Sequence, residues 1–312
     1  MRQQGRYYFY PVQHCNMCGD TSDHHPILGH RLNRSQGFRP RTKTGITTTI
    51  QKCSRCGLIY ANPQPVPFDL QDHYGVPPED YWKPEYFQYD AHYFSQELAT
   101  LRQLMTIQPG MKAMDIGAGL GKCMLSLAGA GFDAYGFEGS ESFHQRALER
   151  MKIDPSKLKQ GTMENVSYEP ETFDFITFGA VLEHLYDPAQ SIAKAVTWLK
   201  PGGVMHIEVP SSRYLISRLI NTYYKLIATN YVTNLSPMHE PYHLFEFGLR
   251  SFEEHAQKTG YTIVLREYYV CSMAPFPRFL HPLLSYIMKK TGTGMQLAVW
   301  LKKNDMNTHR GS

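Results

Sequence analysis

The sequence lacks long hydrophobic runs. The stretch that comes closest to one, 215–232, is interrupted by Arg218, Asn221, Lys225 and Asn230, so no segment reaches the roughly 18 apolar residues of a membrane span. The first 13 residues contain two arginines but no apolar run, so we expect no secretory signal. These absences together predict a cytoplasmic protein without a membrane span.

A strong excess of one charge is also missing. Lys and Arg number 32 and Asp and Glu 28, which gives a formal net charge of +4 over 312 residues. So small a charge does not require a polyanionic partner. Hydrophobic residues at 42% and charged residues at 19% exclude a disordered or fibrous chain. Aromatic residues reach 13%, with 21 tyrosines, and surfaces rich in Tyr often line ligand clefts.

Cysteines are few, but four of the six occur in two short motifs. Each motif places two residues between its cysteines and a glycine after the second one: Cys15-Asn-Met-Cys18-Gly and Cys53-Ser-Arg-Cys56-Gly. This spacing lets a tight turn present both sulfurs to one metal ion, and the glycine can adopt the positive φ of such a turn. We therefore predict a structural Zn²⁺ site made by Cys15, Cys18, Cys53 and Cys56. The alternatives are four unrelated reduced cysteines, or disulfides, which a cytosolic setting disfavours. Nearby histidines could substitute as ligands, but four thiolates already fill a tetrahedral shell. The other two cysteines, Cys123 and Cys271, are expected to be buried small hydrophobic residues.

The first third of the chain is expected to differ from the rest. Residues 47–52 are predicted to form a strand that leads into the second cysteine motif, as in a zinc ribbon, and a proline-rich stretch follows at 62–67. A Tyr-rich segment comes next, with a predicted helix over 86–107. We expect a zinc-ribbon domain over 1–66, a linker and helix over 67–108, a core domain over 109–303 and a disordered tail over 304–312.

Between residues 111 and 210, short apolar strands alternate with amphipathic helices. The predicted strands cover 112–116, 133–138, 173–178 and 204–209. Such alternation predicts an α/β fold with a parallel sheet covered on both faces. Farther along, Ser251 and Glu254 are read as a capping box that opens a helix to residue 258. Two apolar helices, 214–228 and 277–288, are expected as insertions that cover a cleft or make core or dimer contacts.

A glycine-rich turn follows the first core strand. It contains, in order, Asp115, Gly117, Ala118, Gly119 and Gly121. Missing side chains let a ligand approach the backbone at the start of the next helix, and Glu138 at the end of the second strand can accept from ribose hydroxyls. The turn alone is compatible with NAD, FAD or no ligand. Asp115 would repel a pyrophosphate, so it favours a ligand with an ammonium and a sulfonium group.

These residues, together with the motifs below, make the sequence resemble the class I S-adenosylmethionine-dependent methyltransferases over roughly 86–268. The motifs that carry the resemblance are the glycine-rich turn, Glu138, Gly161-Thr-Met-Glu164, Phe173-Asp-Phe, Val181-Leu-Glu-His184 and Leu199-Lys-Pro-Gly-Gly203. The resemblance implies a doubly wound, seven-stranded, mostly parallel Rossmann-like sheet. Its last two strands, 261–270 and 295–301, would form an antiparallel pair at one edge.

The resemblance also implies which residues bind S-adenosylmethionine. In that family the glycine-rich turn holds the methionyl part, the acidic residue of the second strand holds the ribose, and Thr162 and Met163 match positions that flank the adenine. Residues after the fourth strand line the reactive end. The cofactor-binding residues implied are Asp115, Gly117, Ala118, Gly119, Gly121, Glu138, Gly139, Thr162, Met163, Gly179 and Ala180.

The order of ribbon, Tyr-rich helix and core is similar to zinc-containing methyltransferases of deoxysugar and polysaccharide pathways. This similarity implies methyl transfer to a hydroxyl or carbon of a sugar, a nucleotide-sugar or a related small metabolite. One alternative is an RNA base methyltransferase whose ribbon binds RNA. Its support is a short basic stretch in the insertion between the cysteine motifs, made of Arg31, Arg34, Arg39, Arg41 and Lys43. The other is a non-catalytic protein that only binds the cofactor.

An acceptor hydroxyl or carbon acid needs a base, which is most often histidine. His184 follows the fourth strand, whereas His239 and His243 lie after the fifth strand, where the resembling enzymes place the acceptor. Tyr242 could orient the substrate. We predict His243 as the first candidate, with the structural alternative that each histidine only anchors a loop.

Overall fold

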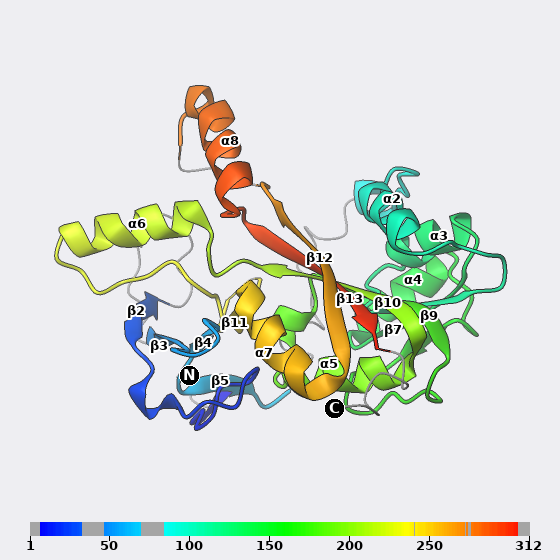
Figure 1. Cartoon of the computed structure of the whole chain (residues 1–312), viewed down its shortest axis with the longest axis horizontal. Helices are drawn as coiled ribbons and strands as arrows, with labels where there is room; N and C mark the ends of the chain where they lie inside the picture. Colours follow the sequence, from blue (N-terminus) through cyan, green and yellow to red (C-terminus); the bar gives the residue numbers. More distant parts are fainter. Residues whose placement is uncertain are drawn as a thin grey trace, which may run out of the picture.

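The computed structural model describes residues 7–32, 47–69, 84–239, 241–271, 273 and 276–304 (Figure 1). Arg34, Arg39, Arg41 and Lys43 lie outside these ranges, as does all but the first residue of the predicted tail 304–312. Within the described ranges, no helix is both long enough and apolar enough to cross a membrane.

The centre of the described structure is a seven-stranded, mostly parallel sheet. Its spatial order is β12–β13–β10–β9–β6–β7–β8. The strands are β6 (Lys112–Ile116), β7 (Asp133–Glu138), β8 (Leu158–Gln160), β9 (Phe173–Gly179), β10 (Leu199–Pro210), β12 (Tyr261–Tyr269) and β13 (Gln296–Lys303). β6, β7, β8, β9 and β10 run parallel, and β13 pairs antiparallel with both β10 and β12. The predicted α/β fold and the antiparallel edge are therefore confirmed.

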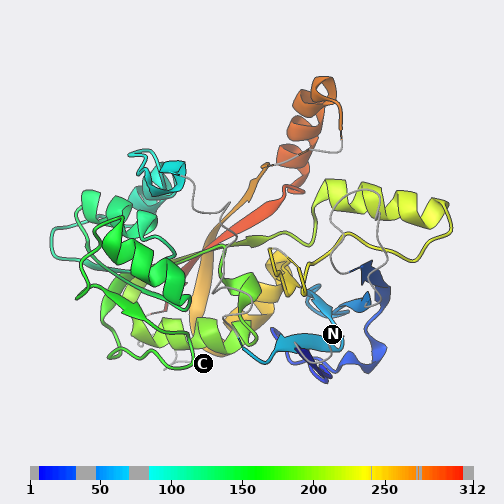
Figure 2. The same ribbon diagram turned by 180° about the vertical axis from the view of Figure 1, so that it is seen from behind.

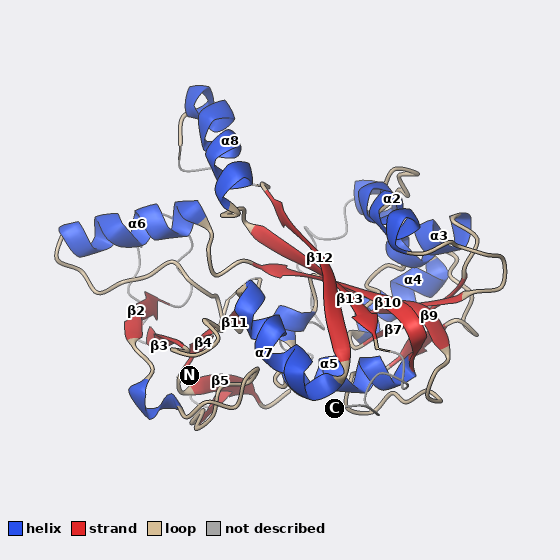
Figure 3. Cartoon of the chain, viewed as in Figure 1, coloured by secondary structure: helices blue, strands red, loops and turns tan. Residues whose placement is uncertain are grey.

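Helices cover both faces of this sheet, as Figure 3 shows. One face carries α2 (Ser95–Leu104), α3 (Lys122–Gly129) and α4 (Glu141–Glu149), and the other carries α5 (Pro188–Trp198) and α7 (Leu249–Thr259). The strands alternate between the two cores: Ala113 and Phe175 belong to the first, and Met114 and Ile176 to the second. This two-sided burial explains the nearly continuous apolar strands of the sequence.

Two of these helices start with the side-chain caps that their sequences favour. Asp187 Oδ1 accepts from Gln190 N at 2.9 Å, and Pro188 occupies the first turn of α5. Ser140 caps α4 by accepting from Phe143 N at 3.4 Å. These bonds satisfy amides that an isolated helix end would leave without a partner, and they fix the loops that leave β7 and β9.

The N-terminal region forms a second sheet of order β11–β4–β3–β2. Its strands are β2 (Ile27–Leu32), β3 (Thr47–Lys52), β4 (Ile59–Ala61) and β11 (Phe245–Glu246), while β1 (Tyr7–Tyr10) pairs with β5 (Gln64–Pro67). β11 comes from the distant segment after β10 and pairs antiparallel with β4, with Phe245 opposite Tyr60. The cysteine region and the core domain therefore share a sheet as well as a hydrophobic core.

Two helices project from the body of the molecule (Figures 1 and 2). They are α6 (Leu215–Leu226) and α8 (His281–Thr291), which follows a 3₁₀ turn, η5 (Arg278–Leu280). Ile216, Ile220 and Tyr224 of α6 form one small core with Met288 of α8. The predicted apolar insertions thus pack against each other.

Three local predictions were wrong. The helix expected over 86–107 covers only α2, because Phe94 adopts a left-handed φ of 62° and only a short 3₁₀ turn, η3 (Pro84–Phe87), precedes it. The capping box does not form: α7 begins after Gly248, and the Ser251 hydroxyl instead donates to Cys56 O at 3.3 Å. Cys271, expected to be buried, is exposed, whereas Cys123 is buried as expected.

Candidate active site

The glycine-rich turn lies between β6 and α3, and its geometry requires glycine at two positions. Gly117 and Gly121 have φ values of 68° and 76°. A Cβ at either position would lie 2.6 Å from a side-chain carbon, of Val181 and of Ile153 respectively. At Gly119 no described atom lies within 4 Å of the place a Cβ would take, so the backbone is open to a ligand there.

Glu138, at the end of β7, reaches across this turn. Its Oε2 accepts from Gly119 N and its Oε1 from Ser140 N, both at 2.7 Å. Each carboxylate oxygen has a second lone pair, so the group keeps the capacity to accept from ribose hydroxyls. Thr162 lies beside it, because a Cβ at Gly139 would be 3.3 Å from Thr162 Cγ2.

Met163, the other residue predicted to flank the adenine, is 3% exposed and belongs to the core beneath α5. Its backbone carbonyl accepts from the ammonium of Lys194 on α5. The predicted ribose and adenine residues are thus neighbours at the ends of β7 and β8.

Several carboxyl groups near the turn have raised pKa values. Burial, together with Glu138, raises the pKa of Asp115 to about 8. Burial and Glu97 of α2 raise the pKa of Glu208 on β10 to about 7. Burial raises the pKa of Tyr93, and Asp115, Glu208 and Glu97 raise it further, so these groups act on one region. A cationic ligand would stabilise the ionised carboxylates. Glu97 and Glu208 could not be identified from the sequence, because one acidic residue in a helix or strand forms no motif.

Gly179 and Ala180 lie beside the glycine-rich turn. Phe178 pairs with Ile116 across β9 and β6, so the residues that follow them are neighbours at the same edge of the sheet. Ala180 has a φ of 56°, which is unfavourable for a residue with a Cβ, and its amide donates to Glu208 O at 3.1 Å. The chain therefore turns sharply away from the sheet, leaving Gly179 and Ala180 exposed.

After this turn, a short 3₁₀ helix, η4 (Leu182–His184), brings Glu183 and His184 against His243. Glu183 Oε1 lies 3.7 Å from His243 Nε2, and the two imidazole rings meet edge to face with centroids 5.1 Å apart. Leu244 N donates to Glu183 O at 2.9 Å, which joins the two segments. The structure thus brings His184 and His243 together, with Glu183 as a third member.

The electrostatic state of these three groups follows from burial. Burial, together with Glu208, raises the pKa of Glu183 to about 8. Burial lowers the pKa of His184 to about 4, and burial with His184 lowers that of His243 to about 3. Both imidazoles are therefore neutral at pH 7. Both values lie below the ordinary imidazole pKa of about 6.5, because the two rings are buried, which the sequence does not show.

His239 lies apart from this cluster. Its Nε2 is 3.2 Å from Arg31 Nη2, and Arg31 Nε donates to Leu235 O at 2.9 Å. Arg31, at 8% exposure, is itself buried, so it is no surface charge for RNA. Tyr242 has a φ of 62°, and its carbonyl oxygen accepts from His184 Nδ1 at 3.3 Å. His239 thus contacts the N-terminal sheet, and Tyr242 orients His184 through its backbone.

The four cysteines of the two motifs meet as predicted. All four are buried, and their sulfurs lie within 4.8 Å of one another. Cys15 and Cys56 have sulfurs 3.5 Å apart, as do Cys18 and Cys53. These separations are too long for a disulfide bond. Zn–S bonds of 2.3 Å in a tetrahedron place sulfurs about 3.8 Å apart, so this donor set fits Zn²⁺. The glycines after each motif have φ values of 77° and 79°, as expected.

A family model described as a methyltransferase domain matches residues 87–266, which is more than half of the chain. This chain belongs to that methyltransferase domain family. The matched range contains the glycine-rich turn, Glu138, Glu183, His184 and His243. The cysteine motifs lie outside it.

The family's relatives match the chain over shorter ranges. A demethylmenaquinone methyltransferase of Bacillus mycoides is 34% identical over 109 residues, which are 32% of this chain and 45% of that protein. A ubiquinone biosynthesis O-methyltransferase of Methylococcus capsulatus is 30% identical over 137 residues, 43% of this chain and 58% of its own. The chain thus spans about half the length of these relatives. A solved S-adenosylmethionine-dependent methyltransferase from Mesorhizobium loti aligns with a TM-score of 0.47 and 15% identity over 69% of this chain and 98% of that chain.

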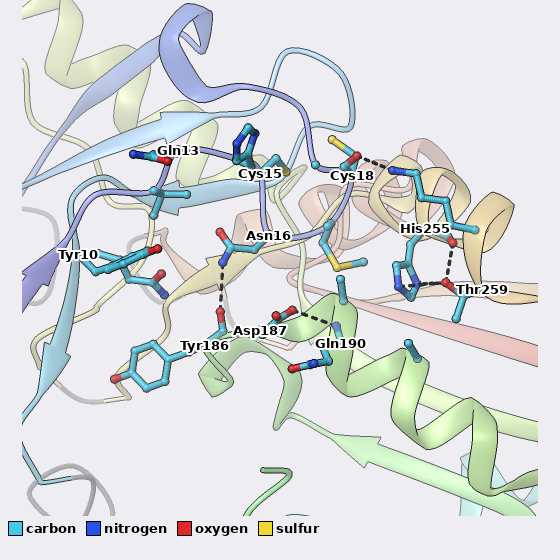
Figure 4. A pocket seen from close by; sticks show the side chains of 18 of the residues that line it. Tyr10, Gln13, Cys15, Asn16, Cys18, Tyr186, Asp187, Gln190, His255 and Thr259 are labelled. Carbon is cyan, nitrogen blue, oxygen red and sulfur yellow. Dashed lines mark hydrogen bonds between the residues drawn. The ribbon is translucent and has the colours of Figure 1, made fainter. Parts of the chain in front are cut away.

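The methyltransferase domain also forms a groove with the N-terminal region (Figure 4). This groove, about 810 Å³ in volume, lies between the first cysteine motif, the β1–β5 pair and helices α5 and α7. Asn16 Nδ2 donates to Tyr186 O at 3.1 Å, and Lys258 Nζ donates to Cys18 O at 2.9 Å across it. Its lining includes no residue of the glycine-rich turn or of the Glu183 cluster. These bonds attach the cysteine region to the methyltransferase domain.

The site of the methyltransferase domain fits S-adenosylmethionine. Open backbone at Gly119, a fixed carboxylate at Glu138 and a buried acidic group at Asp115 match a ligand with a ribose and two positive charges. Asp115 and Glu138 would hold it, and the ligand would supply an electrophilic methyl group next to Gly179 and Ala180.

Proposed function

We propose that this protein transfers the methyl group of S-adenosylmethionine to a hydroxyl, or to a carbon, of a sugar, a nucleotide-sugar or a related small metabolite. The observation that carries the proposal is the pair of acidic groups at the glycine-rich turn. Asp115 has its pKa raised by burial and by Glu138, as expected for a site that awaits a cation. Pyrophosphate cofactors such as NAD would meet repulsion there.

Methyl transfer is an in-line displacement. The acceptor oxygen attacks the methyl carbon, the carbon–sulfur bond breaks, and the sulfur keeps the electron pair as a thioether. The acceptor proton must leave as the new bond forms. We assign this step to the cluster of Glu183, His184 and His243, whose imidazoles are neutral at physiological pH. His243 keeps a quarter of its side chain exposed, so it is the member placed against the acceptor.

A small acceptor is favoured over RNA by two observations. The relatives reported above are named for the demethylmenaquinone and ubiquinone pathways, whose acceptors are small molecules. Arg31, one of the five basic residues that suggested RNA binding, is buried against His239. A sugar acceptor rests on the similarity of the ribbon-and-core arrangement to sugar-pathway enzymes.

Calorimetric titration of the purified chain tests the cofactor. We expect S-adenosylmethionine and S-adenosylhomocysteine each to bind at one site per chain, and NAD not to bind. A matched variant, Asp115→Asn, cannot ionise when the cation binds and has nearly the same shape. It should therefore bind S-adenosylmethionine more weakly than the wild type does, with a smaller loss for the product, whose sulfur is neutral. If the variant binds each of the two ligands as tightly as the wild type does, the assignment of Asp115 is overturned.

The acceptor is tested with labelled S-adenosylmethionine and three panels: nucleotide-sugars and free sugars, quinols, and ribosomal RNA. Transfer of label to a member of the first panel supports the full proposal. Transfer to quinols alone would keep a small-molecule methyltransferase and overturn the sugar class, and transfer to RNA alone would overturn both. Cofactor binding without transfer to any panel would favour the non-catalytic alternative.

A further inference from the structure

Glu183 is the most unusual ionisable group of the described structure. Its side chain is fully buried, and neither carboxylate oxygen has a hydrogen-bond partner within the described residues. A buried carboxyl group without a hydrogen-bond partner lowers the stability of the fold by about 1–3 kcal/mol or more. Such unsatisfied groups are rare in native proteins. His243 Nε2 at 3.7 Å is too far for a hydrogen bond. Both oxygens of Glu183 therefore keep the capacity to bind a further group.

The two histidines beside it are set up as ligands. His184 donates its Nδ1 proton to Tyr242 O, which places the lone pair of the neutral ring on Nε2. A backbone carbonyl that accepts from the second ring nitrogen is the usual outer partner of a metal-bound histidine. Tyr242 itself has a positive φ of 62°, and strained backbone of this kind persists where the surrounding structure holds it.

We propose that Glu183, His184 and His243 bind one divalent transition-metal ion next to the methyl acceptor. One ligand atom from each residue lies within 4.8 Å of the others. Metal bonds of about 2.0–2.2 Å to His and Glu require ligand atoms about 3–3.5 Å apart, so small side-chain rotations complete the site. Two imidazoles and one carboxylate suit Zn²⁺, Fe²⁺ or Co²⁺ and leave open coordination positions.

The position of the ion gives it a role in the proposed reaction, on which this inference rests. The cluster follows directly after Gly179 and Ala180, which lie beside the glycine-rich turn. An acceptor hydroxyl bound to the ion would have a lower pKa. Its proton would pass to solvent water, and the oxygen would then attack the methyl carbon while the sulfur keeps its electron pair. With the ion bound, the cluster would assist proton loss by lowering the pKa of the acceptor, and His243 would take the proton itself only where no ion is bound.

The test uses the full chain and Co²⁺ as the probe, because four-thiolate and nitrogen–oxygen sites give different absorption spectra. The chain is first treated with a mild chelator, and its tightly bound metal is counted. Titration with Co²⁺ should then show one further equivalent with the weak visible bands of a nitrogen–oxygen site. Glu183→Gln and His243→Gln should each weaken this binding by more than about 10-fold, a loss that even outer partners of metal ligands cause. The matched control, His239→Gln, lies on the same segment outside the cluster and should bind Co²⁺ as the wild type does.

The outcomes separate this inference from the proposed function. S-adenosylmethionine should bind to the chelator-treated wild type and to both variants. Such binding shows that these proteins are folded and that the cofactor site is intact. If the wild type then binds no further Co²⁺, or if both variants bind it as tightly as the wild type, the metal site is overturned while the cofactor assignment remains. If methyl transfer is unchanged by removal and return of the ion, the ion has no part in the reaction and His243 is the base. Loss of cofactor binding in the wild type would instead overturn the proposed function.

Discussion

Two of the clusters of side chains that could hold a metal ion in the described residues, the four cysteines and the Glu183 cluster, differ in how they are assembled. The four cysteines come from two tight turns, and each turn is specified by a spacing that the sequence shows. Glu183 and His184 are adjacent, but His243 comes from a segment beyond β10 and α6. The cysteine cluster is closed and fully buried, whereas His243 leaves the other cluster partly open. A closed donor set suits a structural ion, and an open one suits an ion that meets a substrate.

Loss of a cysteine should have the largest effect. Cys53→Ser removes one thiolate of the predicted zinc site, and a bound structural zinc ion contributes on the order of 10 kcal/mol to folding. We expect about one zinc per wild-type chain, and loss of zinc with lower thermal stability and solubility in the variant. Any remaining folded fraction should still bind S-adenosylmethionine. Metal analysis and calorimetry measure this, with the exposed Cys271→Ser as the control. Wild-type protein that contains no zinc, or iron in its place, would contradict the assignment.

The open cluster should control turnover rather than folding. His243→Ala should lower turnover by about 10²–10⁴, the usual loss when the group that activates the acceptor is removed, with cofactor affinity unchanged. His239→Ala should act mainly on stability, because it leaves the buried Arg31 without its ring contact. Steady-state kinetics and thermal unfolding of both variants separate the two roles. A small rate change with a large stability loss in His243→Ala would make His243 a loop anchor as well.

Cofactor binding should depend on neither cluster. Glu138→Ala removes a carboxylate that accepts from Gly119 and Ser140 and faces the proposed ribose. We expect S-adenosylmethionine to bind more weakly by about 1.5–3 kcal/mol, the scale of a hydrogen bond to a charged group. Calorimetry with Glu138→Gln as the comparison measures this. Unchanged affinity in the alanine variant would mean that the ribose contact is misassigned.

A buried histidine outside both clusters should produce the smallest effect. His206 is fully buried, with its Nδ1 3.0 Å from Thr177 Oγ1, and burial lowers its pKa to about 3. Because the folded pKa lies below the unfolded value of about 6.5, the unfolded chain takes up a proton first as the pH falls. The stability contribution of neutral His206 is therefore present above pH 6.5 and is lost toward pH 3.

At pH 5 this difference in pKa lowers the free energy of unfolding by about 2 kcal/mol relative to pH 7. His206→Phe keeps ring contacts with Trp300 and Phe94 and should lose less stability than the wild type between pH 7 and pH 5. Urea unfolding at the two pH values measures the difference, and equal losses in both proteins would contradict the buried, neutral state.

The features that could be predicted from the sequence are those that depend on residues close together along the chain. The strand at 133–138, the helix cap at Asp187 and the cysteine turns each depend on a few consecutive side chains, and all three are present. Ser251 and Glu254 matched a local pattern, but Cys56 O and Arg55 are their partners, because the cysteine region packs on α7. Glu97 and Glu208 were missed for the same reason: their meeting depends on how a helix packs over the sheet.

β4 is synthesised well before β11, the strand with which it pairs. A ribosome releases the segment that ends at Ala61 long before it reaches Phe245, so the growing chain carries β4 with one edge still open. Open strand edges attract other chains. Early capture of zinc by the cysteine turns would hold this segment in shape during that interval. In zinc-poor medium we therefore expect the chains to aggregate during synthesis, and we do not expect them to accumulate as folded but inactive protein.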